Sequence, residues 1–140
     1  MGCPRLLLAD DLPEIRERVT ELLRPHFDIV AVAQSGQQAI EAATILNPDL
    51  LVLDISMPIL DGIQVASRLR DMGCRAIVVF LTVHEDPDYV EAAFSVGASA
   101  YVFKSRVATD LVSAIQGALQ GRRFISVRSR SILRTPVLCL

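Results

Sequence analysis

Runs of apolar residues alternate with helical patterns five times along this 140-residue chain. Two of the runs, Leu50–Leu53 and Ala76–Leu81, are apolar at every position, which is typical of strands buried on both faces. The runs predict five strands, at Arg5–Ala9, Phe27–Ala33, Asp49–Leu53, Ala76–Leu81 and Ala100–Phe103.

Helix signals follow each of these runs. Asp11-Leu12-Pro13-Glu14 combines an Asp at the N-cap, a Pro in the first turn and a Glu soon after, so it predicts a helix start. The other predicted helices begin or end at Gly, Pro, Asn or Asp, and the full set comprises 11–25, 35–47, 61–72, 87–96 and 109–120.

This order predicts an α/β fold, a doubly wound five-stranded parallel sheet with helices on both faces and right-handed crossovers. We expect one domain over residues 1–121. Residues 122–140 have no clear period and carry five arginines with no acid, which indicates a basic linker or C-terminal arm.

Chemistry-bearing residues follow four of the five predicted strands, where open parallel sheets bind ligands. They are Asp10 and Asp11, Asp54, Thr82 and Lys104. Each has an ordinary alternative role, because caps, turns and strand ends are where such residues belong. Asp11 is the helix cap in that alternative, and Lys104 is simply solvated. Complementary chemistry at all four ends favours a site.

The charges of this group predict what it binds. Three carboxylates and one ammonium sum to −2, so a cation is needed to keep the carboxylates ionised. Oxygen ligands without His or Cys suit Mg²⁺. Lys104 is the only lysine of the chain. Asp54, which follows the central strand, is then the best nucleophile toward phosphorus, forming an aspartyl phosphate.

These residues resemble the receiver domain of two-component response regulators, whose fold is flavodoxin-like with five strand–helix units. The match runs from about residue 5 to 120. It rests on Asp10-Asp11, Asp54, Met57-Pro58, Asp61-Gly62, Thr82, Gly97-Ala98 and Tyr101-Val102-Phe103-Lys104, in the family's order and spacing.

The resemblance implies that Asp54 accepts a phosphoryl group from the phosphohistidine of a sensor histidine kinase. It implies a Mg²⁺ site made by Asp11, Asp54 and the backbone carbonyl of Ser56, with Asp10 assisting. Lys104 would pair with the phosphoryl group.

The resemblance also implies a switch, in which Thr82 swings toward the phosphoryl group and the Tyr101 ring turns inward. Ser56 and His84 lie where the family tunes the phosphoryl lifetime. The ordinary alternatives are that Tyr101 is a strand aromatic and that His84 is a solvated loop residue.

The last helix resembles that of receivers preceding LuxR-type helix-turn-helix domains. The nineteen residues after Gly121 are too few for such a domain, so we expect a stand-alone receiver or a truncated regulator. The tail shows no recognition helix, so direct DNA binding by this chain is not expected. The expected partners are the kinase and an output partner or second copy on the face of the fourth helix, fifth strand and fifth helix. Transcriptional control is expected at pathway level.

Three other functions fit the sequence less well. A haloacid-dehalogenase-like phosphatase would carry a second Asp where Ser56 stands, and a flavodoxin-like nucleotide binder would not place carboxylates after the first strand. A receiver that binds partners without phosphorylation would lack site residues that are present here. We therefore expect a signalling phosphoacceptor and not an enzyme.

The remaining signals concern location. No apolar stretch approaches the roughly 18 residues of a membrane span. The N-terminus lacks a secretory pattern. Three widely spaced cysteines indicate reduced thiols. We expect a cytoplasmic protein without membrane contact.

Overall fold

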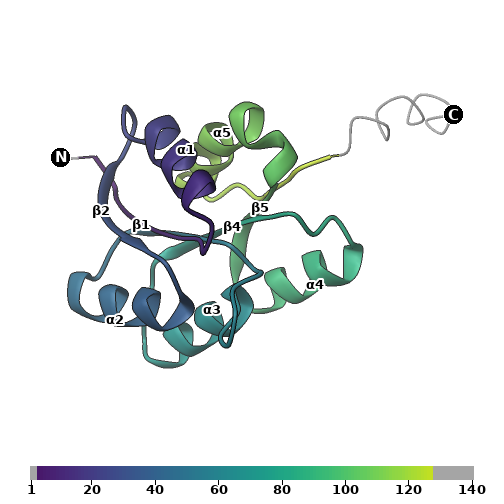
Figure 1. The fold of residues 1–140 in the computed structure, drawn as a ribbon. Coiled ribbons are helices and arrows are strands. Elements are labelled where there is room, and N and C mark those ends of the chain that lie inside the picture. The colour runs from purple at the N-terminus through teal and green to yellow at the C-terminus, as the bar shows by residue number, and fades with distance from the viewer. Residues whose placement is uncertain (1–2, 128–140) are drawn as a thin grey trace, which may run out of the picture.

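The computed structural model describes residues 3–127, which form a parallel sheet with helices on both faces (Figure 1). The strand order is β2-β1-β3-β4-β5-β6. The strands are β1 (Arg5–Ala9), β2 (Asp28–Ala33), β3 (Leu50–Leu53), β4 (Ile77–Thr82), β5 (Ala98–Phe103) and β6 (Phe124–Ile125).

The helices divide between the two faces of the sheet (Figure 1). Helices α1 (Pro13–Leu23) and α5 (Val107–Leu119) cover one face; α2 (Gly36–Leu46), α3 (Gly62–Asp71) and α4 (Pro87–Ser95) cover the other. Each face has its own apolar core, and β3 contributes Leu51 and Leu53 to one and Leu50 and Val52 to the other. This double burial explains why β3 is apolar throughout.

Strand order determines where the polar strand ends meet. Because β1 lies between β2 and β3, the chain reverses its direction of winding next to β1, and the carboxyl ends of β1 and β3 are neighbours. Such a switch point opens a crevice at the carboxyl edge of the sheet. The residues that follow β1 and β3 are therefore brought together.

Side chains cap the first turns of α2 and α3, whereas the cap predicted for Asp11 at α1 is absent. Ser35 caps α2 by accepting from the Gln38 N–H, and Asp61 forms a capping box with Gln64 at α3. At α1, however, the N-cap residue is Leu12, which makes no side-chain cap. Asp11 is therefore not a helix cap.

The sheet has six strands and not five. Residues Phe124 and Ile125 pair in parallel with Ala100 and Tyr101 of β5. A two-residue strand is too short to show a period of two, which is why the sequence pattern did not predict it. Of the basic tail, Arg122 and Arg123 lie within the described residues, and Arg128, Arg130 and Arg134 lie outside them.

Other boundaries differ by one or two residues. Strand β5 begins at Ala98, directly after Gly97, whose φ of 96° suits glycine. Helix α5 begins at Val107, after a 3₁₀ turn, Lys104–Arg106, that the sequence did not predict. Within residues 3–127 no helix has the length and apolar character needed to cross a membrane.

Candidate functional site

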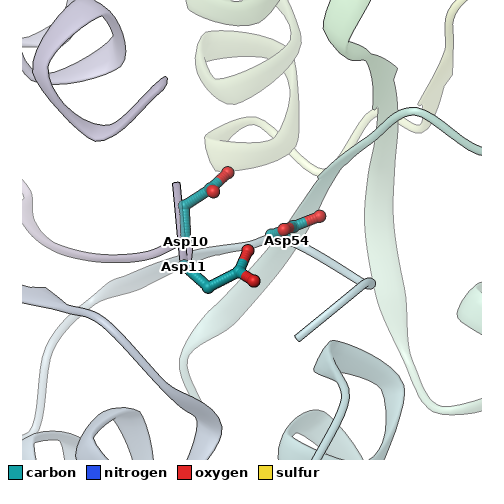
Figure 2. A group of neighbouring side chains, drawn as sticks. All are labelled: Asp10, Asp11 and Asp54. Atoms are coloured by element: carbon teal, nitrogen blue, oxygen red, sulfur yellow. The ribbon is translucent and has the colours of Figure 1, made fainter. Parts of the chain in front are cut away.

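Three carboxylates meet at the carboxyl edge of the sheet (Figure 2). Asp10 and Asp11 follow β1, and Asp54 follows β3. One oxygen from each lies within 4.8 Å of the others. Asp10 and Asp54 are buried, with exposed fractions of 0 % and 2 %, whereas Asp11 is half-buried. The expected convergence of these residues is therefore present.

Lys104 brings the one ammonium to this cluster. Its Nζ lies 2.8 Å from Asp10 Oδ2 and 3.3 Å from Asp54 Oδ2, and its side chain is only 9 % exposed. A buried ion pair of this kind stabilises the fold only when its charges are well compensated. Here one cation faces two carboxylates directly, so the site carries excess negative charge.

That excess is visible in the acidity of Asp54. Burial, and then the charge of Asp10, raise the pKa of Asp54 from 3.8 to about 6, although Lys104 and the backbone N–H of Ser56 oppose the rise. A raised pKa means that the ionised carboxylate is disfavoured in the metal-free protein. A bound cation would relieve this cost.

Backbone groups fix the orientation of the buried carboxylates. Asp10 Oδ1 accepts from the Leu12 N–H at 2.9 Å, and Asp54 Oδ1 accepts from the Ser56 N–H at 3.2 Å. Arg16 of α1 also donates to the Asp10 carbonyl at 2.9 Å. The acids that end β1 and β3 are thus held in place by the turns that follow them.

Gly62 permits the tight return of the chain from β3 into α3. A Cβ at this position would stand 2.2 Å from the Asp54 carbonyl oxygen, so no larger residue fits without displacing the backbone. Its N–H donates to the Ile55 carbonyl at 2.9 Å. The first residue of α3 is therefore packed directly against the carboxylate's own backbone.

Thr82, His84 and Tyr101 are joined by hydrogen bonds beside the cluster. Thr82 is fully buried, and its Oγ1 accepts from the His84 N–H at 3.1 Å. The Tyr101 hydroxyl donates to the His84 carbonyl at 2.7 Å. The Tyr101 ring is already buried, and burial raises the pKa of its phenol, which stays a donor.

The side chain of His84 extends this connection toward β3. Its Nε2 is hydrogen-bonded to the Ser56 hydroxyl, and its ring stacks on Tyr89 of α4 with centroids 4.0 Å apart. The imidazole is half-buried in the loop between β4 and α4, and these contacts orient it. His84 thus contacts the loop after β3, helix α4 and strand β5.

Four sequence-predicted residues form one contact group: Asp10, Asp11, Asp54 and Lys104. The other four, Ser56, Thr82, His84 and Tyr101, form a second group that joins the first through the Ser56 N–H.

Sequence reasoning did not single out Arg16, Tyr89 or the pair Arg106 and Asp110, which contact site residues or the chain next to them. Arg106, the N-cap residue of α5, and Asp110 in its first turn are four residues apart, a spacing that indicates an ion pair. The contacts of Arg16 and Tyr89 depend on tertiary packing and have no local signature.

The donor set fits a hard divalent cation. Every candidate ligand in the cluster is a carboxylate oxygen, and the carbonyl of Ser56 belongs to the adjacent loop. Oxygen donors with room for water are what Mg²⁺ takes in proteins. The excess charge and the raised pKa of Asp54 are consistent with such an ion.

Known proteins resemble this chain in sequence. The sequence profile of the response regulator receiver domain matches residues 6–116. The transcriptional regulatory protein PdtaR of Mycobacterium tuberculosis is 40 % identical over 123 residues, which cover 87 % of this chain and 60 % of PdtaR. The nitrate/nitrite response regulator protein NarL of Escherichia coli K12 is 33 % identical over 123 residues, or 86 % of this chain and 57 % of NarL. The chain thus spans well under two thirds of these relatives.

Solved structures also resemble this chain in fold. A LuxR-family two-component response regulator from Aurantimonas sp. SI85-9A1 is 34 % identical, with a TM-score of 0.84 over 89 % of this chain and 91 % of that one. The signal receiver domain of the putative response regulator NarL from Mycobacterium tuberculosis is 31 % identical, with a TM-score of 0.82 over 87 % of this chain and all of that one.

Proposed function

Because this chain belongs to the response regulator receiver domain family, we propose that it is a phosphorylation-controlled switch whose phosphoacceptor is Asp54. The donor is the phosphohistidine of a sensor histidine kinase. In the transfer, the bond between the histidine nitrogen and phosphorus breaks as a bond from an Asp54 oxygen to phosphorus forms. The kinase histidine leaves with the electron pair of the broken bond.

One observation carries this proposal: a buried carboxylate with an ammonium 3.3 Å from one oxygen and a backbone N–H on the other. Lys104 is within reach of the oxygens of a phosphoryl group on Asp54. Its charge would stabilise them in a low-dielectric site, where such an interaction is stronger than in water. Asp10 shares the same ammonium and keeps Lys104 at the site before transfer.

The same site would use Mg²⁺ as cofactor. Asp11, Asp54 and the Ser56 carbonyl would hold the ion, with Asp10 assisting, and it would supply positive charge against the phosphoryl oxygens. Asp11 is half-buried and does not cap α1, so helix capping does not account for its carboxylate.

Thr82, Tyr101 and Lys104 would carry the switch. The Thr82 hydroxyl accepts from His84 in the resting protein and has its own proton to donate to a phosphoryl oxygen. The Tyr101 ring is already inward and anchored on the His84 carbonyl, so a change at Thr82 reaches Tyr101 through His84. A new charge at Asp54 would bias this connected group toward a second arrangement.

Ser56 and His84 would set the lifetime of the phosphoryl group. Their hydrogen bond joins the loops after β3 and β4 beside Asp54. The Ser56–His84 contact would limit the approach of a water molecule to the phosphoryl group, and the His84 imidazole could orient such a water for attack. Self-dephosphorylation would then depend on both side chains.

The signal would pass to a partner through α4, β5 and α5, serving a transcriptional response in the cytoplasm. A phosphatase of the haloacid dehalogenase type is not favoured, because Ser56 bonds His84 at the place where that class needs a carboxylic acid. A receiver that works without phosphorylation would not need Lys104 at two carboxylates.

The test is incubation of the full chain with Mg²⁺ and acetyl phosphate, read by intact mass. We expect one added phosphoryl group, lost in Asp54→Asn and retained in Asp71→Asn, an exposed carboxylate at the end of α3. An unmodified wild type, or a modified Asp54→Asn variant, would overturn the proposal.

A further inference from the structure

A buried hydrogen-bond network joins the segment after α5 to the strand that ends at Lys104. Ser126, which follows β6, donates from Oγ to Asp110 Oδ2 at 2.7 Å and accepts from the Phe103 N–H at 3.1 Å. Ser126 and Asp110 are only 3 % and 7 % exposed. Phe103 is the residue immediately before Lys104.

The same carboxylate holds the chain on the other side of Lys104. Arg106 donates from Nε to Asp110 Oδ2 at 2.9 Å and from Nη2 to Oδ1 at 3.4 Å. The chain from Phe103 to Arg106 is therefore tied at both ends to one pair of side chains. Lys104 lies between the two ties.

Packing alone does not explain this arrangement. Burying a carboxylate and a hydroxyl costs free energy unless both are hydrogen-bonded, and an apolar pair of similar size would avoid that cost. Strand β6 has only two residues; Phe124 is half-buried and packs against the core beneath α1 and α5, whereas Ile125 is 45 % exposed. The hydrogen bonds of Ser126 and Asp110 are directional, so they fix the position of the neighbouring backbone, which apolar contacts of β6 do not.

Lys104 needs such geometry. Its ammonium sits on a flexible four-carbon stem, yet it must meet Asp10 and Asp54 at 2.8 and 3.3 Å. A long side chain is held at that precision only if its backbone is fixed. Of the described residues, only Ser126 gives a side-chain hydrogen bond to the backbone of Phe103.

We propose that Asp110 and Ser126 are positioning residues for Lys104, so that the segment after α5 is part of the phosphoryl site. Neither side chain touches the phosphoryl group; both act through the chain from Phe103 to Arg106. This inference rests on the proposed function, because the Lys104 ammonium that Asp110 and Ser126 position is the one that would bind the phosphoryl oxygens.

Lys104 is the only lysine of the chain, so a protein labelled with ¹⁵Nζ,¹³Cε-lysine gives one side-chain NMR signal. In the resting wild type we expect a restrained side chain. Ser126→Ala should make the Lys104 side chain measurably more mobile, although its ion pairs with Asp10 and Asp54 remain. Ile125→Ala, which perturbs β6 and keeps the hydroxyl, should leave it as restrained as in wild type. An unchanged signal in Ser126→Ala would overturn the proposal, whether or not the protein accepts phosphate.

Kinetics separate positioning from general destabilisation. With acetyl phosphate and Mg²⁺, Ser126→Ala should slow phosphorylation roughly three- to tenfold, yet cause no further loss in a Lys104→Ala background, because both changes remove the same interaction. An equal loss in both backgrounds would contradict positioning through Lys104.

The two proposals fail in different ways. If wild type gains no phosphoryl group, the proposed function falls and the NMR comparison still decides the role of Ser126. If wild type is phosphorylated and Ser126→Ala matches it in rate and in lysine mobility, only the positioning role falls.

Discussion

Asp54 is an acid whose surroundings disfavour its own charge. Its carboxylate is buried beside Asp10, with one ammonium shared between the two. Because Asp10, Asp54 and Lys104 come from three different strand ends, each residue alone has an ordinary explanation. It is the contact of the Lys104 ammonium with the carboxylates of Asp10 and Asp54 that indicates a functional site.

The pKa of Asp54 makes a stability prediction. In the folded, metal-free protein the pKa is about 6, against 3.8 as the ordinary value, so folding takes up a proton between those pH values. The free energy of unfolding should therefore fall as pH rises from about 4 to about 6, by an amount on the order of 1–3 kcal/mol.

Asp54→Asn should abolish this dependence, since the amide has no charge to bury. In chelator, the variant should be more stable than wild type at pH 7, and the gap should close below about pH 4. Urea unfolding at several pH values measures it. A variant that is less stable than wild type at neutral pH would contradict the account.

Ile59 is strained at the residue level. It is a β-branched residue with a φ of 72°, in the loop between Ser56 and α3, and its side chain is fully exposed. This conformation costs free energy that no burial offsets. Ile59→Asn should raise the free energy of unfolding by roughly 1 kcal/mol, because Asn tolerates the left-handed region.

A matched control is Ile45→Asn, which replaces another exposed isoleucine, within α2. There the backbone is helical and Asn is a weaker helix former, so stability should fall slightly. Chemical denaturation of both variants decides the matter; equal effects would mean that Ile59 is not strained.

At the scale of elements, the start of α3 depends on a close approach of two backbone segments. Gly62→Ala would put a Cβ 2.2 Å from the Asp54 carbonyl oxygen, which the backbone has to relieve by moving. We expect a loss of about 1–3 kcal/mol in stability and a weaker affinity for Mg²⁺, because the moved backbone belongs to the proposed ligands Asp54 and Ser56.

Gly117→Ala is the control for that change. Gly117 lies inside α5, and an added Cβ meets nothing closer than 3.8 Å. Alanine there should stabilise the helix by up to about 1 kcal/mol. If Gly62→Ala behaved in thermal unfolding and Mg²⁺ titration like Gly117→Ala, the close approach would have no functional consequence.

At the scale of the whole molecule, the hydrophobic pattern predicted a sheet with helices on both faces but not the edge strand β6. Doubly apolar runs such as Leu50–Leu53 are too short for a helix and are bounded by polar and turn residues, which favours a strand covered on both faces. The five strand–helix units and the strand-end residues could therefore be predicted. The pairing of Phe124 and Ile125 with β5 could not, because two residues carry no period.

The side-chain network of the site was predictable only in part. The charges of Asp10, Asp11, Asp54 and Lys104 indicated a shared site. The hydrogen bond of Ser126 to Asp110 joins residues 16 apart on different elements, so it follows from packing that no local pattern encodes.

Binding of Mg²⁺ should raise the stability of the whole domain, because an ion that binds only the folded state shifts the folding equilibrium. We expect the thermal midpoint to rise with Mg²⁺ concentration in wild type and hardly at all in Asp11→Asn. A rise of the same size in both proteins would show that Asp11 is not a ligand.

An acyl phosphate on Asp54 can be detected chemically, because borohydride reduces it to a stable product. After treatment with acetyl phosphate and Mg²⁺, reduction should convert residue 54, and no other, to homoserine, as read by peptide mass. Phosphorylated protein in which residue 54 remains aspartate, or homoserine at another position, would contradict the account.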